Sequence, residues 1–197
     1  GGMINMKYIF KGSKVGFTEP KKEYVGLYKD WFNDLEVNQF TSACGAVLTR
    51  QEEEDWYQAQ AENDEPIFTI HYLVDDKPIG NCGLHNFNRG SDHAEMGIVL
   101  GEKDYWNRGL GTEAVRLITD YGFAALSLHA ISLWVKSFNH RAIRVYEKVG
   151  YQESGRVRDF YRVDGEHHDQ VLMDVLRGEF YEINEHAVRD QYLTGLK

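Results

Sequence analysis

The chain has 197 residues, of which 42% are hydrophobic and 27% are charged, a composition typical of a folded globular domain. Its formal net charge of −9 argues against a protein that binds nucleic acid by neutralising phosphates, and suits either a cationic partner or ordinary solubility. No apolar run approaches membrane-spanning length and no secretory signal is recognisable, so we expect a cytoplasmic protein without a membrane partner.

The start of the chain and its two cysteines carry little functional information. Residues 1–6 begin with Gly-Gly-Met, which we interpret as a remnant of cloning and expect to be disordered. Residues 7–197 contain no linker, repeat or low-complexity tract and are expected to form one domain. Cys44 and Cys82 lack metal-ligand spacing, so we expect them to be small apolar side chains in a reducing compartment.

Hydrophobic spacing divides the first half of the chain into short strands and two helices. Aromatic and aliphatic side chains recur at helical spacing in the first helix, and Thr49 with Glu52 forms the pattern of a capping box at the start of the second. Polar turns separate the later strands. In chain order we expect strands at 7–10 and 14–18, helices at 22–33 and 49–62, and strands at 67–74, 79–87 and 93–100.

The second half is expected to place a strand between two helices and to finish with a hairpin and a helix. Val115, Ile118 and Ala125 form an apolar stripe on the first of these helices, and Gly150 is placed to end the second. An Asp-Gly pair between the last two strands is a strong hairpin signal. In chain order we expect a helix at 112–126, a strand at 130–137, a helix at 137–149, strands at 158–163 and 167–176, and a helix at 177–193.

This order of elements predicts an α/β fold. Mostly antiparallel strands come first, and a helix, a strand, a helix and a hairpin follow. That order favours a mixed, mostly antiparallel central sheet with helices on both faces, and it does not match the regular alternation of an open doubly wound sheet.

Two glycines stand one residue apart in the segment YWNRGLGTEA, at the start of a predicted helix. The N–H groups and partial positive charge of a helix N-terminus favour phosphate. A dinucleotide-binding fingerprint is formally matched, but no strand runs directly into Gly109 and no acidic residue follows the next strand. A nucleoside-triphosphate loop would require Gly-Lys-Ser/Thr, which the segment lacks. Taken alone, the glycines fit a structural turn equally well.

A second segment, NHRAIRVYEKVGY, follows the intervening strand. Together the two segments resemble the signatures of the GCN5-related N-acetyltransferase (GNAT) superfamily, and within it the bacterial branch that acetylates ribosomal-protein N-termini, polyamines and other amines. The resemblance covers about residues 14–176. The family places Gln or Arg three residues before the first loop glycine, where this chain has Trp106, a departure common in that branch. The resemblance implies a GNAT-like acyl-CoA N-acyltransferase fold, acetyl coenzyme A as cosubstrate, no metal, and direct transfer to an amine.

The resemblance also indicates which residues contact the cofactor. The end of the strand at 93–100 would hydrogen-bond the pantetheine arm through its backbone, and the glycine loop would wrap the pyrophosphate with its amides. Arg108 either adds positive charge there or is a solvated surface residue, and Asn139 either contacts the cofactor or only caps its helix. The expected cofactor-binding residues are Ile98, Val99, Leu100, Asn107, Arg108, Gly109, Leu110, Gly111, Thr112 and Asn139.

Two residues are candidates for catalysis. Tyr146 lies seven residues after Asn139, on roughly the same helix face, and the resemblance gives it the role of hydrogen-bonding or protonating the leaving thiolate. Glu95 is the candidate base that takes a proton from the acceptor amine, with His85 or His93 as substitutes. The structural alternatives are a core tyrosine and a solvent-facing carboxylate.

The acceptor site is expected between the first two helices and at the last hairpin. Aromatic side chains beside carboxylates suit a cationic small molecule or a protein N-terminus, and they also suit ordinary packing. His167 and His168 alternate across a strand, so a shared metal site is not expected. The candidate acceptor residues are Trp31, Phe32, Asp34, Glu36, Phe40, Thr41, Phe160, Tyr161 and Asp164.

Two other functions stay open at this point. One is an acyl-coenzyme A binding or sensing module without catalysis, which could dispense with Tyr146. The other is a partner-binding protein that uses the fold alone, which could dispense with the intact glycine loop. Formation of a homo-oligomer is compatible with each reading.

Overall fold

The computed structural model describes residues 7–42, 45–62 and 64–194. These residues form two units, one made of the chain up to Gly83 together with Ile98–Ala114, the other of Leu84–Gly97 and the chain from Val115 onward. We call them the first and second unit. The expectations for residues 1–6 and Cys44 lie outside the described residues, and a single domain over 7–197 stays a prediction.

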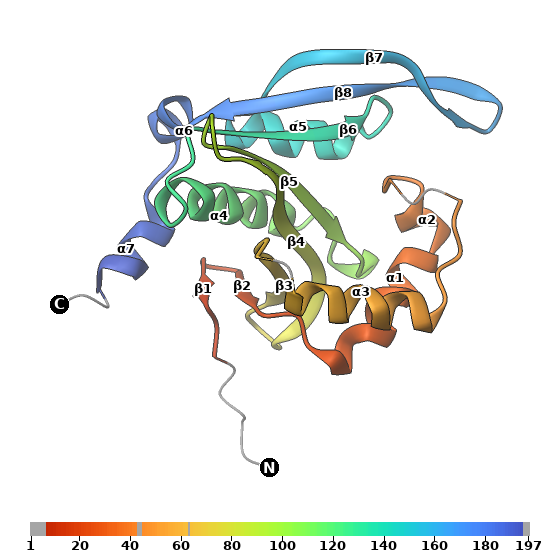
Figure 1. The fold of residues 1–197 in the computed structure, drawn as a ribbon, viewed down its shortest axis with the longest axis horizontal. Coiled ribbons are helices and arrows are strands. Elements are labelled where there is room, and N and C mark those ends of the chain that lie inside the picture. The colour runs from red at the N-terminus through yellow and green to blue at the C-terminus, as the bar shows by residue number, and fades with distance from the viewer. Residues whose placement is uncertain (1–6, 43–44, 63, 195–197) are drawn as a thin grey trace. The chain divides into compact units, whose positions relative to one another are not determined.

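The first unit contains strands that the sequence places to within a few residues. Its order is β1-β2-β3-β4-β5, where β4 and β5 also contribute residues to the second unit (Figure 1). The expected strand at 7–10 is shorter and later than predicted, and β3 ends two residues earlier. The strands are β1 (Phe10–Lys11), β2 (Val15–Thr18), β3 (Ile67–Tyr72), β4 (Lys77–Asn88) and β5 (His93–Leu100).

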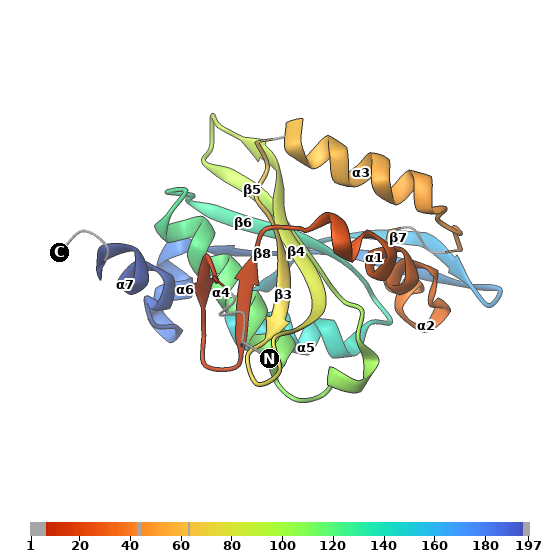
Figure 2. The same cartoon turned by 90° about the horizontal axis from the view of Figure 1, so that it is seen from below.

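One helix of the first unit begins at a capping box. The backbone N–H of Thr49 donates to Glu52 Oε2 at 2.7 Å and the Glu52 N–H donates to Thr49 Oγ1 at 3.2 Å, so the predicted capping box is confirmed. Figure 2 shows the helix that follows it, α3, running beside the sheet of this unit. The helices are η1 (Lys22–Tyr24), α1 (Val25–Asn33), α2 (Leu35–Asn38), α3 (Arg50–Glu62), η2 (Lys103–Tyr105) and the first turn of α4 (Leu110–Ala124).

Aromatic side chains fill the core of the first unit. The rings of Phe10 and Phe17 stack at 4.5 Å, and Phe68 meets Phe10 edge-on at 5.2 Å. The hydroxyls of Tyr28 and Thr69 share a buried hydrogen bond of 2.6 Å, which joins α1 to β3. Burying the Tyr28 ring between helix and sheet therefore leaves no polar atom of that pair unsatisfied. Cys82 is also buried, as expected.

The sheet of the second unit contains one parallel contact. The start of β5 pairs in parallel with β6 (Ala130–Lys136), β6 pairs antiparallel with β8 (Glu166–Leu176), and β8 pairs antiparallel with β7 (Gln152–Val163). Asp164 and Gly165 have φ of 51° and 84°, the backbone of the predicted two-residue turn, and the long hairpin that results is visible in Figure 1. The mixed, mostly antiparallel α/β fold is confirmed.

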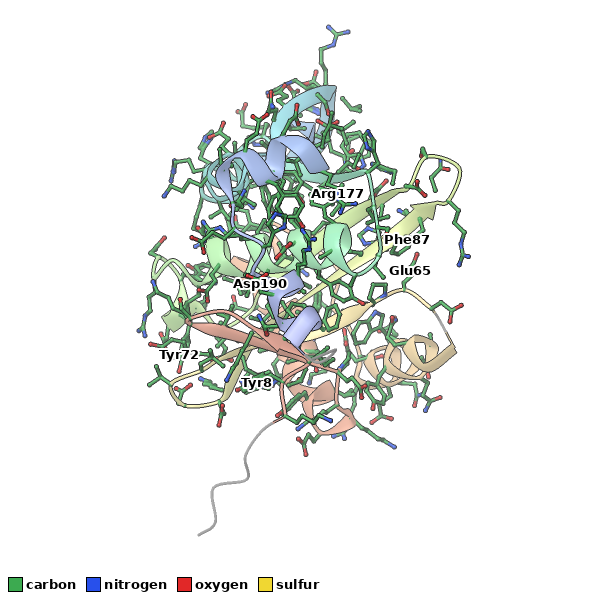
Figure 3. All side chains as sticks on the ribbon, turned by 90° about the vertical axis from the view of Figure 1, so that its left-hand side faces the viewer. Tyr8, Glu65, Tyr72, Phe87, Arg177 and Asp190 are labelled. Carbon is green, nitrogen blue, oxygen red and sulfur yellow. The ribbon has the colours of Figure 1, made fainter. Side chains whose placement is uncertain are left out.

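The C-terminal helix expected at 177–193 is instead two helices. Arg177 begins α6 (Arg177–Ile183) and Asp190 lies in α7 (Ala187–Thr194); both residues are labelled in Figure 3. Asn184 has an extended backbone, and its side-chain amide donates to the carbonyls of Val149 and Phe180 at 2.9 Å. These tertiary contacts end α6 at a point where the hydrophobic pattern continues.

The other helices of the second unit nearly follow the prediction. The rest of α4 ends at Ala124, so Ala125 is exposed outside the helix and the expectation that it lies on the apolar stripe is wrong. Helix α5 (His140–Val149) ends at Gly150, whose φ of 111° is left-handed, as expected of a helix stop. Among the described helices, none combines the length and the apolar character that crossing a bilayer requires.

Candidate functional site

The glycine loop of the first unit forms a sharp entry to α4. Asn107 and Gly109 both have positive φ, 60° and 78°, which turns the chain immediately before the helix. The first helical hydrogen bond runs from the Glu113 N–H to the Gly109 carbonyl at 3.2 Å. The amides at 110–112 precede that bond and have no intrahelical acceptor, so they can bind an anion.

The two loop glycines have different structural roles. Gly109 adopts the left-handed conformation that disfavours a side chain, whereas no positive φ is found at Gly111. A Cβ on Gly111 would lie 3.2 Å from Leu100 Cδ1, which makes this helix position tight against the end of β5. Gly111 therefore supports close packing of the helix, and Gly109 supports the turn.

The end of β5 is held on two sides by the first unit. A Cβ on Gly80 would lie 2.1 Å from the Val99 carbonyl oxygen, so the β4 backbone approaches β5 closely at this position. Trp106 Nε1 donates to the Leu100 carbonyl at 2.8 Å, which joins the loop to the strand end. Trp106, where the family has Gln or Arg, thus fixes the geometry between the two segments expected to bind the cofactor. The side chains of Ile98, Val99 and Leu100 are half-buried.

The residues around the loop differ in exposure. Asn107, Arg108 and Gly109 are exposed, Leu110 is buried, and the residues at 111–112 are half-buried. The Arg108 guanidinium lies 5.1 Å from the centre of the Tyr105 ring, a cation–π distance. Since the Leu110 side chain belongs to the core, only its backbone can face a ligand.

In the second unit, Asn139 has the capping role that the sequence allowed. Its Oδ1 accepts from the Ala142 N–H at 3.2 Å and its own N–H donates to the Lys136 carbonyl at 2.8 Å. The side chain is buried, with 9% exposed. The capping hydrogen bond therefore gives the side-chain oxygen of Asn139 a structural role. A contact between Asn139 and the cofactor stays a prediction.

Tyr146 lies on the buried face of α5 with 7% of its surface exposed. Burial raises the pKa of its phenol to about 12, so the group is protonated at neutral pH and can donate. Its ring lies 6.0 Å from that of Tyr151, whose hydroxyl is paired with Thr119 Oγ1 at 2.8 Å. Within the described residues we find no hydrogen bond to the Tyr146 hydroxyl. The two tyrosines are therefore distinct: Tyr151 is a satisfied core residue, while Tyr146 has a donor available.

Glu95 is part of a small polar group in the second unit. Its Oε2 accepts from Asn86 Nδ2 at 3.2 Å and lies 3.7 Å from His85 Nε2. Side chains of consecutive strand residues normally point to opposite faces. The φ of 52° at Asn86 interrupts this alternation, so that the side chains of both His85 and Asn86 reach Glu95. The structure thus brings together two of the base candidates, Glu95 and His85. His93 lies two residues before Glu95 on the same strand.

The acidic acceptor candidates of the first unit already have a partner. Lys103 Nζ lies 2.7 Å from Asp34 Oδ2 and 2.9 Å from Glu36 Oε2. The hydrogen bond from Lys103 is the main reason that the pKa of Asp34 is below its usual value. Trp31 is buried against Gly101, and its Nε1 donates to Glu102 Oε1 at 2.8 Å, so it is a packing residue. These contacts favour the structural reading of this cluster.

A residue that the sequence analysis missed contacts the hairpin of the second unit. Lys136, at the end of β6, is only 3% exposed, and its ammonium lies 4.4 Å from the centre of the Tyr161 ring. Phe160 is 55% exposed and Asp164 lies in the turn. A lysine at a strand end normally predicts solvent exposure, so only the tertiary structure reveals this buried cation. Within the described residues no three His, Cys, Asp or Glu side chains are grouped to hold a metal ion.

Comparisons with known proteins agree on one family. A family model described as an acetyltransferase (GNAT) domain matches residues 15–152. The uncharacterized N-acetyltransferase p20 of Bacillus licheniformis is 31% identical over 113 residues, and the spermidine N(1)-acetyltransferase of Escherichia coli is 29% identical over 119 residues. These alignments span 57% and 60% of this chain, and 63% and 62% of the relatives' own lengths.

The solved structures show the fold. A spermidine N-acetyltransferase from Vibrio cholerae, in complex with CoA and spermine, has a TM-score of 0.78 at 21% identity. The superposition covers 86% of this chain and 99% of the other. At this identity the likeness establishes the fold and leaves the substrate open.

Proposed function

Because the chain belongs to the GNAT acetyltransferase family, we propose that it transfers the acetyl group of acetyl coenzyme A directly to the nitrogen of a primary amine. The observation that carries this proposal is the family match over 15–152, which includes both signature segments. The left-handed Gly109 at the entry to α4 is the local geometry that such a signature requires.

The glycine loop has the chemistry to hold the pyrophosphate of the cosubstrate. Its free amides at 110–112, the helix N-terminus and the exposed Arg108 all favour an anion. The backbone of Ile98–Leu100 is fixed by the contacts of Trp106 and Gly80, and we assign it to the pantetheine arm. Bound acetyl coenzyme A supplies the thioester.

Removal of a proton from the acceptor is assigned to Glu95. A lysine-like amine has a pKa of about 10 and is mostly protonated at neutral pH, so it must lose a proton before it attacks. The carboxylate of Glu95, with His85 Nε2 at 3.7 Å, can accept that proton and pass it on through the imidazole. Asn86 orients the carboxylate by its hydrogen bond.

Tyr146 is assigned to the leaving thiolate. A thiol has an ordinary pKa of about 8.5, so a phenol whose pKa is about 12 is the weaker acid of the two. Complete proton transfer from Tyr146 to a thiolate is therefore unfavourable, and a hydrogen bond to the developing negative charge is the favoured form of assistance. The proton that finally joins the sulfur comes from the amine or from solvent.

The acceptor is proposed to be a cationic amine, either a polyamine or a protein N-terminus. The net charge of −9 attracts such a molecule, and one similar relative is a spermidine N(1)-acetyltransferase. A cytoplasmic location and assembly into a homo-oligomer stay predictions.

A panel of amines tests the proposal. Acetyl coenzyme A is incubated with a polyamine, an alanine-terminated peptide, an amino acid or an aminoglycoside, and release of free thiol is followed. At least one amine should accelerate thiol release over the acceptor-free reaction. Mass spectrometry should find that this amine has gained about 42 Da, which is the mass added when one acetyl group replaces a hydrogen. Binding of acetyl coenzyme A without transfer to any amine would favour the sensing module instead.

A further inference from the structure

The turn between β1 and β2 is attached to the first turn of α4 by one carboxylate. Glu113 Oε1 accepts from the N–H and the hydroxyl of Ser13 at 3.0 and 2.5 Å, and Oε2 accepts from the N–H groups of Lys14 and Val15 at 2.7 and 2.8 Å. Burial opposes ionisation of Glu113, but these hydrogen bonds outweigh it and lower its pKa. The turn is therefore held by a charged group with every oxygen engaged.

This attachment places the side chain of Lys14 at the glycine loop. Lys14 Nζ lies 3.5 Å from the Arg108 carbonyl oxygen, and it is also 3.5 Å from the position that a Cβ on Gly109 would occupy. The ammonium thus lies beside the residue whose left-handed backbone opens the helix N-terminus. All of these residues belong to the first unit.

The charge balance at this helix entry favours a role for Lys14 in binding an anion. Glu113 is a negative group in the first turn of α4, and it would repel a phosphate approaching the same amides. Lys14 brings a positive charge to the loop from the segment that Glu113 holds. Arg108 directly precedes Gly109 and packs over the Tyr105 ring at 5.1 Å, whereas Lys14 brings a second positive charge to Gly109 from a segment distant in the sequence.

We propose that Lys14 is a phosphate-binding residue of this acetyltransferase, and that Glu113 is the positioning residue that delivers it to the loop. The proposal rests on the proposed function, because the phosphate is one of those in coenzyme A. Its ligand chemistry is a phosphate ester or diphosphate, and the experiment distinguishes the pyrophosphate from the 3′-phosphate.

The first experiment measures binding of coenzyme A by isothermal titration to wild type, Lys14→Gln and Lys14→Arg. Lys14→Gln should weaken binding roughly tenfold at low salt, and the difference should shrink at high salt because the lost interaction is between charges. Lys14→Arg should restore most of the affinity. Lys22→Gln, at an exposed lysine in η1 of the same unit, is the control for loss of one positive charge.

Titration with 3′-dephospho-coenzyme A identifies the phosphate. If Lys14 binds the pyrophosphate, Lys14→Gln should weaken the binding of coenzyme A and of 3′-dephospho-coenzyme A by the same factor. If Lys14 binds the 3′-phosphate, Lys14→Gln should weaken only the binding of coenzyme A. Either pattern supports the proposal. Equal affinities of Lys14→Gln and Lys22→Gln for both ligands would overturn it.

A double-mutant cycle tests the positioning role of Glu113. Glu113→Gln replaces an acceptor oxygen by a donor amide that cannot bind the backbone N–H groups of the turn. It should weaken coenzyme A binding when Lys14 is present and have little further effect in Lys14→Gln. Additive effects would contradict the positioning role, because they would mean that Glu113 acts on binding independently of Lys14.

Two readouts keep these outcomes separate. Circular dichroism and thermal melting show whether each variant is folded, and Lys14→Gln keeps the backbone bonds to Glu113. If wild-type protein itself does not bind coenzyme A, the proposed function fails and the role of Lys14 fails with it. If wild type binds and Lys14→Gln binds equally well, only the role of Lys14 is wrong.

Discussion

At the scale of single residues, Tyr146 and Tyr151 lie close together near the end of α5 but differ in the hydrogen bonding of their hydroxyls. Tyr151 donates to or accepts from Thr119, and Tyr146 has only ring contacts and burial to define it. Of the two hydroxyls, that of Tyr151 is engaged within the described residues, and that of Tyr146 is available for the role proposed for it.

Tyr146→Phe should therefore reduce turnover about a hundredfold while folding and cofactor affinity largely survive. The effect should be smaller with a thioester whose thiol is more acidic, since such a leaving group needs less assistance. Because the pKa of Tyr146 is raised to about 12, its ionisation should cause no loss of activity below about pH 11 in wild type. Steady-state rates under conditions where chemistry is limiting test this, and a variant at the wild-type rate would falsify the assignment.

Glu95→Gln should lower the rate and leave the affinity for acetyl coenzyme A nearly unchanged. The glutamine keeps the contact to Asn86 but cannot take a proton, so the acidic limb of the pH–rate profile should change shape. His85→Gln is the matched control, and a smaller loss is expected for it if the imidazole only relays the proton. Normal rates for Glu95→Gln at every pH would mean that the amine enters already neutral or that another group is the base.

At the scale of elements, the entry to α4 depends on space as well as on conformation. Gly111→Val should weaken coenzyme A binding at least tenfold, about 1.4 kcal/mol, because the new side chain would displace Leu100 at the end of β5 and narrow access to the helix amides. Gly26→Ala is the control, since a Cβ there meets nothing within 4 Å. Unchanged affinity in folded Gly111→Val would show that this helix entry does not hold the pyrophosphate.

A buried acid of α4 binds both C-terminal helices of the second unit. Asp120, which is fully buried, accepts from the Tyr181 hydroxyl at 2.6 Å and from the Val188 N–H at 2.7 Å. Asp120→Ala should reduce the free energy of unfolding by about 2–4 kcal/mol, because it leaves both donors unsatisfied. Tyr181→Phe removes only one partner and should cost less. Urea unfolding measures both, and equal values would show that the Val188 bond contributes nothing.

The elements that the sequence predicted best are those defined by local chemistry. Strand β5 has the expected bounds, and the capping box at Thr49, the stop at Gly150 and the Asp-Gly hairpin all form as expected. Each of these signals acts within a few residues, so no tertiary contact is needed to read it.

Very short elements and features that depend on distant contacts were not predictable. The short helix α2 begins at the Asp34 cap, whose Oδ1 accepts from the Glu36 N–H, and four residues are too few to show a period. Lys14 and Glu113 are 99 residues apart, and although Glu113 lies within the segment YWNRGLGTEA, nothing in the sequence pairs it with Lys14. For the candidate site, the signature residues could be named from sequence, but the grouping of His85, Asn86 and Glu95 depends on the backbone of Asn86. Their catalytic and binding roles stay predictions.

At the scale of the whole molecule, the net charge of −9 predicts how salt affects the reaction. A polyamine carries several positive charges, so its encounter with an acidic protein should be weakened by added salt more than that of a monoamine. Raising the ionic strength from about 0.05 to about 0.5 M should lower kcat/KM severalfold for the polyamine and less for the monoamine. The same salt dependence for both would show that the overall charge does not select the acceptor.

The attachment of the first turn of the chain to Glu113 has a consequence during synthesis. Ser13, Lys14 and Val15 leave the ribosome about 100 residues before the carboxylate that binds their amides. At about 5–20 residues per second, that interval is roughly 5–20 s. Throughout it the amides of the turn lack the carboxylate that binds them, and Lys14 has no glycine loop to face. The turn between β1 and β2 therefore reaches its final contacts only after about 100 further residues have been made.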